Sequence, residues 1–407
     1  MAQKSEQAII LADKMEVLAK KLTSSVETIR EDKGQGAARD FTDIIESADA
    51  LLLELKGPMD HMMDLMVGLS KFVAMRLFIK WGLFDKIPAE GAISYEDLAK
   101  GIGADTGLVA RFGAALVANG VLRQVDDAKV AHTAQSKALL NDSPLKGLVC
   151  LGYDTQLKSM AKLASYFDTF GLHEPIGKYN TPVAFAAGDA SLTIWEHVNS
   201  NPEEKKNFML AMVAMANKHI TIGNYDFSWA VAKAAESPDR PLVVDVGGGQ
   251  GHALQEIVDA NPGLAMERCV LEDLAPVLEQ AKANAKGSIQ RAQFVALDFH
   301  SEQPVKGALV YYIRRCLHDY GDDDCVDILK QISDAMAADS RVLIVENVLG
   351  VPAAPSAVGN DIFMMMLGGK ERTLEGFKSI MMRAGLVVEK LWRFKGTEYA
   401  VVEGRKV

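Results

Sequence analysis

The sequence predicts an α/β chain of two parts: a helical N-terminal part that includes a winged-helix unit, and a doubly wound Rossmann-like domain over 237–407. Three observations lead to this fold class. After Pro241, apolar strand-like stretches alternate with amphipathic helical ones, as in a mainly parallel sheet with helices on both faces. The first strand runs into the glycine-rich stretch 247–251, a feature of nucleotide-binding α/β folds. Before 237 the apolar residues recur almost only at helical spacing.

Residues 1–56 form the first predicted segment, a helical arm. Two helices are expected there, separated by Gly34-Gln35-Gly36. Their apolar faces carry residues at helical spacing: Ile9, Ile10, Met15, Leu18 and Leu22 in the first, and Ile44, Ile45, Leu51, Leu52 and Leu53 in the second. Such faces need a covering surface, which is either the rest of the same chain or a second subunit. The sequence leaves both alternatives open.

The segment 57–145 is predicted to be a winged-helix-like dimerisation domain. Ser94 is a suitable N-cap for one helix, and a second helix is expected over 107–119. Gly120 then opens a two-stranded wing. Winged helices often bind DNA, but the second helix contains a single basic residue, Arg111, and gains little affinity for phosphates from it. Packing or dimerisation is therefore the expected role, and we expect a homodimer.

The composition narrows the classes of protein further. The chain has 407 residues and a net charge of -10, which argues against a dedicated nucleic-acid-binding protein. The cysteines lack Cys-x-x-Cys spacing and indicate neither a zinc site nor a disulfide framework. The acidic run Asp322-Asp323-Asp324 suits the start of a helix better than a metal site. No apolar stretch reaches the roughly 18 residues that span a bilayer, and the N-terminus lacks the core of a signal peptide. We expect a soluble, cytoplasmic protein without a metal.

The segment 146–236 is predicted to be helical, a linker that also contributes to a substrate pocket. Bulky apolar residues at helical spacing are usually core residues, but directly before a cofactor domain they also form pocket walls. Six residues are candidates for such walls: Trp195, Phe208, Met212, Phe363, Met364 and Met365. They indicate a flat or greasy ligand and no particular one.

Strands and helices are expected to alternate from Leu242 onward. Strands are predicted over 242–246, 268–271, 292–297, 307–313 and 340–346, with a final pair near 387–393 and 399–402. Helices are predicted over 253–260, 276–285, 324–337 and 374–384. The ligand of such a fold binds at the carboxyl ends of the strands.

The glycines after the first strand indicate the kind of cofactor. Gly247, Gly249 and Gly251 have the spacing G-x-G-x-G, whereas the dinucleotide fingerprint has its third glycine one residue later. This spacing favours S-adenosylmethionine over NAD. The next strand ends in Glu272-Asp273, where a carboxylate is suited to accept hydrogen bonds from ribose hydroxyls.

Further polar residues follow the later strands. Asp298 and Phe299 come after the third strand, where they either hold an adenine or are a loop acid and a core aromatic residue. His318 follows the fourth strand, and an ordinary imidazole pKa near 6.5 suits a base that removes a phenolic proton near neutral pH. Glu346 and Glu371 are candidates to accept the second imidazole N–H, although each also suits a helix cap or a solvent-facing position.

The ordered motifs VVDVGGGQGH, LEDL, DF, LHDYGDDDC, VEN and GGKERT resemble the plant and fungal class I O-methyltransferases that act on phenolic small molecules. The similarity extends over about 57–404, and the arm is longer than in plant members. The resemblance implies S-adenosylmethionine as cofactor, and His318 as general base between Glu346 and Glu371. It also implies a set of cofactor-binding residues: Asp245, Gly247, Gly249, Asp273, Asp298, Phe299 and Arg314. Arg314 stands where the plant enzymes usually have a lysine, which keeps the charge and changes the geometry.

The function that we expect is methyl transfer from S-adenosylmethionine to a phenolic or enolic hydroxyl of a secondary metabolite. The alternative is a pericyclase or cyclase on the same fold, because some fungal relatives use the cofactor as a positive charge without transferring its methyl. Those relatives tend to have a cationic residue at the position of the histidine. His318 with its two glutamates therefore favours methyl transfer, while Arg314-Arg315 keep the alternative open. The acidic charge disfavours a DNA-binding regulator.

Overall fold

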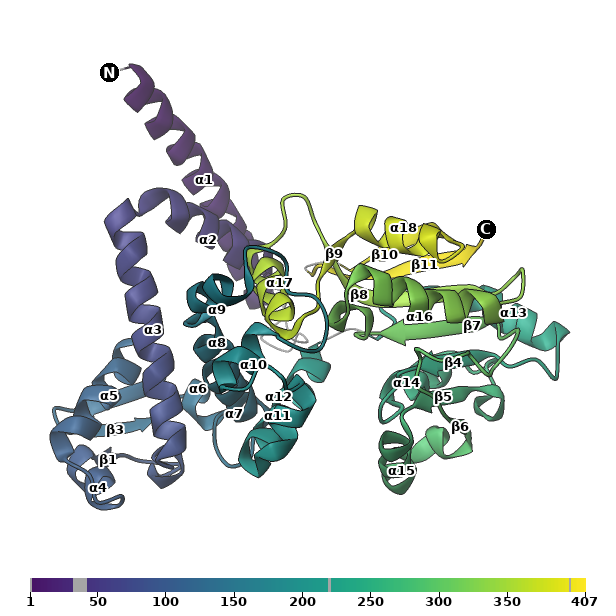
Figure 1. Cartoon of the computed structure of the whole chain (residues 1–407). Coiled ribbons are helices and arrows are strands. Elements are labelled where there is room, and N and C mark those ends of the chain that lie inside the picture. Colours follow the sequence, from purple (N-terminus) through teal and green to yellow (C-terminus); the bar gives the residue numbers. More distant parts are fainter. Residues whose placement is uncertain (1, 32–41, 219–220, 395–396) are drawn as a thin grey trace. The chain divides into compact units, whose positions relative to one another are not determined.

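The computed structural model describes residues 2–31, 42–218, 221–394 and 397–407 (Figure 1). The chain divides into two compact units, one up to Gln135 and the other from Ser136 onward. The finer division at 56, 145 and 236 stays a prediction. Among the described residues, no helix combines the length and the apolar character that a bilayer span requires.

The first unit begins with the helical arm. The arm consists of α1 (Ala2–Glu31) and α2 (Thr42–Leu55), which pack on each other, and the predicted glycine break lies outside the described residues. α3 (Pro58–Lys80) follows. The first half of α3 exposes a series of large apolar side chains: Met59, Met62, Met63, Leu65 and Met66. This face resembles the exposed apolar faces that mark protein interfaces.

Two further helices and a small sheet complete the first unit. α4 (Tyr95–Lys100) begins at the predicted N-cap, where Ser94 Oγ accepts a hydrogen bond of 3.0 Å from the Asp97 N–H. α5 (Thr106–Ala118) is capped by Asp105. The antiparallel sheet has the order β1 (Ile93–Ser94), β3 (Lys129–His132), β2 (Leu122–Asp126). The predicted helices and hairpin of this segment are therefore present.

Helices make up the first part of the second unit. They are α7 (Pro144–Leu151), a π-helical turn (Gly152–Leu157), α8 (Lys158–Met160), α9 (Leu163–Phe170), α10 (Pro182–Ala187), α11 (Ile194–Ser200), α12 (Pro202–Lys218) and α13 (Ser228–Glu236), and a short helix, α6 (Ala134–Lys137), precedes them. α12 packs along α7, so this part forms its own helical layer (Figure 1).

A twisted sheet forms the rest of the second unit. Its strand order is β10 (Leu386–Arg393), β11 (Tyr399–Lys406), β8 (Arg341–Leu349), β7 (Val310–Arg314), β4 (Val243–Val246), β5 (Val270–Asp273), β6 (Gln293–Ala296), and β9 (Arg372–Thr373) pairs with β8 off this path. The pairings from β8 to β6 are parallel, and those of β11 are antiparallel. The predicted strands are confirmed, whereas the short β9 was not foreseen.

Helices cover both faces of this sheet, as the sequence predicted. α13, α14 (His252–Ala260) and α15 (Ala275–Asn284) pack against one face, and α16 (Asp322–Ala335) and α18 (Leu374–Arg383) against the other. α17 (Pro355–Leu367), which the sequence analysis did not predict as a helix, lies between β8 and β9 in the chain. From β4 the chain proceeds to β5 and β6 on one side and to β7 and β8 on the other. Folds of this kind bind their ligand in a crevice at such a reversal, which here lies at the carboxyl ends of β4 and β7.

Candidate active site

The glycine-rich loop after β4 approaches the crevice through its backbone. Gly247, Gly249 and Gly251 have φ values of 68°, 58° and 78°, in the left-handed region that favours glycine. A Cβ on Gly249 would meet no atom within 4 Å, whereas one on Gly247 would lie 2.9 Å from the Cys316 sulfur. The loop is therefore packed tightly at Gly247 and has open space at Gly249.

The acidic end of β5 is tied to this loop. Asp273 Oδ2 accepts a hydrogen bond of 2.8 Å from the Gly249 N–H, and its Oδ1 accepts one of 2.7 Å from the Leu274 N–H. The carboxylate is thus fixed beside the open space at Gly249. This is the location that the sequence analysis predicted for a ribose contact.

Two side chains of opposite charge, the buried Asp245 and the half-buried Arg314, each have a buried polar atom without a hydrogen-bond partner among the described residues. Asp245 on β4 is 1% exposed, and its Oδ2 has no hydrogen-bond partner among the described residues. Burial raises the pKa of Asp245 to about 7, against the lowering effect of the Arg314 charge. Arg314 at the end of β7 has its own unpartnered buried nitrogen, Nη1. Because buried polar groups are normally paired, a carboxylate and a guanidinium with unpartnered atoms fit a zwitterionic ligand such as the amino acid end of S-adenosylmethionine.

The predicted adenine residues lie on the other side of the loop. Phe299 Cε1 would be 3.3 Å from a Cβ on Gly247, so its ring lies against the glycine loop. The ring also contacts Tyr320 edge-on, with 5.8 Å between centroids. Asp298 Oδ1 accepts a hydrogen bond of 3.0 Å from the His300 N–H, which orders the turn that carries both residues. The structure thus brings the predicted cofactor residues together around the glycine loop.

His318 lies on the short 3₁₀ turn Leu317–Asp319, directly after β7, and is buried. Its Nδ1 is 3.1 Å from Glu371 Oε1 and 3.8 Å from Glu346 Oε2. A carboxylate accepts only, so Nδ1 carries the proton that it donates to Glu371. In the neutral imidazole, Nε2 is then the atom with the free lone pair.

The two glutamates are held in different ways. Glu346, buried on β8, accepts hydrogen bonds of 2.9 and 3.0 Å at Oε1 from the backbone N–H groups of Cys316 and Leu317. Glu371 Oε1 accepts from His318 and also from the side-chain amides of Asn347, at 3.2 Å, and Asn360, at 2.6 Å. Glu346 therefore fixes the turn before the histidine, and Glu371 fixes the imidazole itself.

The surrounding carboxylates change the pKa values of this group. Burial lowers the pKa of His318, but the charges of Glu346 and Asp319 and the contact with Glu371 outweigh it and raise the pKa to about 10. Burial raises the pKa of Glu346 to about 7, although His318 opposes the shift. For Glu371 the hydrogen bonds and charge of His318 outweigh burial, so its pKa is lowered. The ordinary imidazole pKa assumed from the sequence is therefore not what the folded site produces.

The same three side chains are also close enough together for a metal. One ligand atom from each of His318, Glu346 and Glu371 lies within 4.8 Å of the others. Glu371 Oε1, however, already accepts three N–H donors, and the remaining Nδ1 contact orients the imidazole. The arrangement suits proton transfer by a fixed histidine, with Nε2 as the reactive atom.

The candidate pocket walls fall into two groups. Trp195 on α11 packs edge-on against Phe208 on α12, with 5.5 Å between ring centroids, and Met212 is one turn further along α12. The other three, Phe363, Met364 and Met365, lie on α17, which contacts the 3₁₀ turn of His318. The role of both groups in a common pocket stays a prediction.

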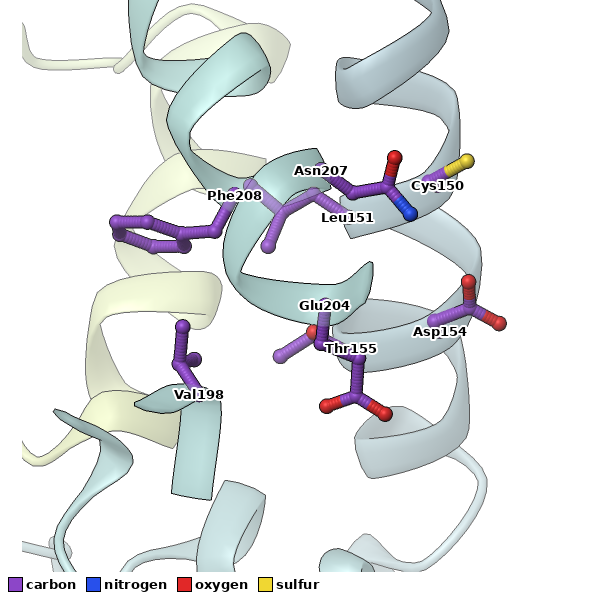
Figure 2. Close-up of a pocket in the computed structure, with 8 residues that line it drawn as sticks. All are labelled: Cys150, Leu151, Asp154, Thr155, Val198, Glu204, Asn207 and Phe208. Atoms are coloured by element: carbon purple, nitrogen blue, oxygen red, sulfur yellow. The ribbon is translucent and has the colours of Figure 1, made fainter. Parts of the chain in front are cut away.

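One cavity lies beside the first of these groups. Figure 2 shows it between α7, the π-helical turn and α12, with Phe208, Val198 and Leu151 among its lining residues. It encloses only about 10 Å³, which is room for one water molecule. This cavity is too small for a substrate.

Sequence reasoning missed the residues that support the dyad of His318 and Glu371. Asn347 directly follows Glu346, so the motif VEN contained a signal that was not used. Asn360 gave no local signal, because it reaches Glu371 only through the packing of α17.

Comparisons with known proteins identify the family of the chain. The model of the O-methyltransferase domain matches residues 176–387, and that of the O-methyltransferase dimerisation domain matches 63–142. The chain is 37% identical to methyltransferase cfoD of Aspergillus candidus over 398 residues, which cover 96% of this chain and 98% of that one.

Solved structures share the fold over nearly the whole chain. OxaC superposes with a TM-score of 0.81 at 23% identity, covering 98% of this chain and 100% of that one. LepI in complex with S-adenosylmethionine gives a TM-score of 0.79 at 22% identity, covering 96% and 100%. A structure described as a pericyclic reaction enzyme gives a TM-score of 0.76 at 22% identity, covering 95% and 100%. At these identities the likeness concerns the fold alone.

Proposed function

Because the chain belongs to the O-methyltransferase family, we propose that it methylates a phenolic or enolic hydroxyl of a small-molecule secondary metabolite, with His318 as general base. The family membership makes the protein an S-adenosylmethionine-dependent methyltransferase. The observation that carries the proposal is the 3.1 Å contact between His318 Nδ1 and Glu371, which leaves Nε2 as the atom that receives a proton.

The chemistry requires little from the protein beyond alignment and one proton transfer. When bound, S-adenosylmethionine supplies an electrophilic methyl group on a sulfonium sulfur. His318 Nε2 would accept the proton that the substrate hydroxyl loses as its oxygen takes that methyl. Glu371 stabilises the imidazolium that results, because the Nδ1–H remains hydrogen-bonded to its carboxylate. Loss of that proton to solvent returns the neutral imidazole, the form that becomes more abundant as pH rises toward 10.

The proposed cofactor contacts follow from the charges around the glycine loop. Asp273 is placed to accept the ribose hydroxyls, and Phe299 with Asp298 to hold the adenine beside Gly247. Asp245 and Arg314 would hold the ammonium and carboxylate groups of the methionine part, which would give partners to the two buried atoms that lack them.

A second candidate function is supported by one observation. The raised pKa of His318 keeps the imidazole cationic at neutral pH, and a cationic hydrogen-bond donor is what a pericyclase on this fold needs. Arg314 and Arg315 add further positive charge at the same strand end. The fold also occurs in a pericyclic reaction enzyme. We favour methyl transfer because the chain belongs to the O-methyltransferase family and its relative cfoD is a methyltransferase.

We also propose a homodimer. The segment that matches the dimerisation domain includes much of α3, whose first half exposes a continuous series of methionines and leucines. Covering such a face in a second copy removes apolar surface from water. The arm of α1 and α2 is proposed to join the same interface.

The products separate the two candidate functions. The enzyme is incubated with methyl-labelled S-adenosylmethionine and a set of phenolic and enolic metabolites, and the products are analysed by mass spectrometry. Methyl transfer yields S-adenosylhomocysteine in equal amount to a product that is heavier by one methylene. A product of unchanged mass, formed without S-adenosylhomocysteine, would overturn the proposal in favour of the pericyclase.

A further inference from the structure

Arg372 is a buried arginine whose guanidinium N–H groups donate mainly to backbone carbonyls. It lies on β9 and is 3% exposed. Its Nη1 donates to Leu317 O at 3.0 Å and to Lys370 O at 3.1 Å, its Nη2 to Tyr320 O at 2.8 Å, and its Nε to Asp322 Oδ1 at 2.8 Å. The guanidinium is thus satisfied by one carboxylate and three carbonyls.

Those acceptors belong to the two segments that carry the dyad. Leu317 and Tyr320 stand on either side of the His318 turn, and Lys370 directly precedes Glu371. Arg372 reaches across 55 residues of sequence to Leu317. One guanidinium therefore joins the backbone of the histidine turn to the backbone of the glutamate.

The two segments also touch each other directly. The Lys370 N–H donates to His318 O at 2.7 Å. A Cβ on Gly369 would lie 2.1 Å from that same carbonyl oxygen, so only glycine permits the approach. The glycine allows the segments to meet, and Arg372 donates hydrogen bonds to the backbone of both.

The His318 turn needs such external support. A single 3₁₀ turn has few internal hydrogen bonds, and their geometry is poorer than in an α-helix. The planar fork of arginine offers five N–H donors in a fixed arrangement, which a lysine ammonium does not reproduce. The orientation of the turn thus depends on donors from outside it.

We propose that Arg372 is a positioning residue of the active site, which keeps His318 in hydrogen-bond contact with Glu371 by clamping the backbone of both segments. This inference rests on the proposed role of His318 as base. Without the clamp, the turn shifts relative to β9 and the 3.1 Å contact at Nδ1 lengthens. Nε2 is then no longer aimed consistently at the substrate, although the cofactor residues around Gly249 are untouched.

The test compares arginine variants at two ends of the sheet. Arg372→Met and Arg372→Lys remove the fork, and Arg268→Met is the matched control. Arg268 also donates to backbone carbonyls, with Nη1 to Ala234 O at 3.1 Å and Nε to Arg240 O at 3.0 Å, but it precedes β5 and lies far from His318 in the fold. Both sites lose comparable buried hydrogen bonds, so both variants are expected to melt at lower temperature.

Three measurements then distinguish positioning from stability alone. In the Arg372 variants kcat falls about 10- to 100-fold, the usual effect of losing a group that orients a catalytic residue, while the cofactor Kd is unchanged. The imidazole NMR signal of His318, identified by its absence in His318→Ala, titrates at lower pH than in the wild type because the Glu371 contact is weakened. Arg268→Met keeps the wild-type kcat and the wild-type titration.

A second pair of variants with smaller expected effects keeps the test possible if the Arg372 variants do not fold. Asp322→Asn removes the carboxylate partner of Arg372, and Asp323→Asn is its control, because Asp323 is also in the first turn of α16 but pairs with Arg383 instead. Asp322→Asn is expected to shift the His318 titration in the same direction by less, and Asp323→Asn to leave it unchanged. Folded Arg372 variants with the wild-type kcat and titration would overturn the inference. The titration is measured without substrate, so it tests the positioning role of Arg372 independently of the proposed base. This holds even if His318→Ala proves fully active.

Discussion

The two ends of the parallel sheet differ in whether their polar side chains have hydrogen-bond partners. At the amino ends, Arg240 donates to Gly307 O at 2.6 Å and to both oxygens of Asp339 at 2.9 and 2.7 Å, and Arg268 donates to the carbonyls of Ala234 and Arg240. At the carboxyl ends, five buried atoms have no hydrogen-bond partner among the described residues: Asp245 Oδ2, Glu272 Oε1, Arg314 Nη1, Glu346 Oε2 and Glu371 Oε2.

This difference distinguishes buried groups that stabilise the fold from buried groups that are available to bind a ligand. A buried polar atom without a partner costs about 1 to 3 kcal/mol, so the carboxyl end is held in a less favourable state than the amino end. A ligand that supplies the missing partners recovers that free energy on binding. The polar groups at the amino ends are therefore paired within the protein, whereas those at the carboxyl ends can pair with a charged ligand.

The largest effect is expected for His318→Ala. Methylation should fall by about 10²- to 10⁴-fold, because general-base catalysis typically contributes that factor, while cofactor binding persists. His197→Ala is the control, since His197 also pairs with a glutamate, Glu204, at 3.2 Å but on α11 and α12. Rates and cofactor affinity are measured by release of S-adenosylhomocysteine and by calorimetry. A His318→Ala enzyme that methylates at the wild-type rate refutes the proposed base.

A large effect of pH is expected for the same reason. The pKa of His318 is raised to about 10, so the neutral imidazole becomes more abundant as pH rises from 7 toward 10, by up to about tenfold per unit. The rate of methyl transfer should increase over this window. The stability that the raised pKa contributes is complete below about pH 6.5 and is lost as pH rises through 10.

The control for this profile is His318→Ala, whose remaining slope belongs to the ionisation of the substrate. Initial rates are measured in the folded range at each pH. For a pericyclase that uses imidazolium, the rate falls over the same window, so the sign of the slope decides between the functions. A flat profile in the wild type contradicts both.

The sequence predicted the parts of the site that depend on local order. Strand ends are marked by the change from apolar to polar residues, which located Asp273, His318 and Glu346 correctly at the carboxyl ends. The glycine spacing located the loop after β4, and the structure adds the positive φ values of Gly247 and Gly249.

The remainder depends on contacts between distant segments. Arg372 donates to carbonyl groups, which every residue has, so no pattern of residue types marks its acceptors. The raised pKa of His318 arises from Glu346, from its chain neighbour Asp319 and from Glu371, and only the fold brings Glu346 and Glu371 to the histidine. Sequence reasoning therefore identified Glu371 and His318 but missed the residues that fix the distance between them.

A smaller effect is expected at the ribose contact. Asp273→Ala should weaken cofactor binding by about 1.5 to 3 kcal/mol, the usual contribution of a hydrogen bond to a charged group. The control is Glu267→Ala, an acid near the amino end of β5 whose partner is Arg291 at 2.8 Å. Calorimetry measures both. Equal cofactor affinity in the wild type and Asp273→Ala would rule out the ribose assignment.

The smallest effect tests the open space at the glycine loop. Gly249 and Gly307 have φ values of 58° and 68°, and a Cβ on either would meet no atom within 4 Å. Alanine at either position should cost roughly 1 kcal/mol of stability, because the left-handed conformation is unfavourable for a residue with a Cβ. The two glycines differ in location, since Gly307 precedes β7 at the amino end of the sheet.

Only Gly249→Ala places its methyl in space that the cofactor is proposed to need. Displacing a ligand by a methyl group costs about 1 kcal/mol, so the cofactor Kd should rise about fivefold in Gly249→Ala and stay at the wild-type value in Gly307→Ala. Thermal melting and calorimetry on both variants separate the loss of stability from the loss of affinity. If both variants lose stability equally and neither loses affinity, the open space at Gly249 is not the cofactor site, and the contrast between the two ends of the sheet must be explained by another ligand.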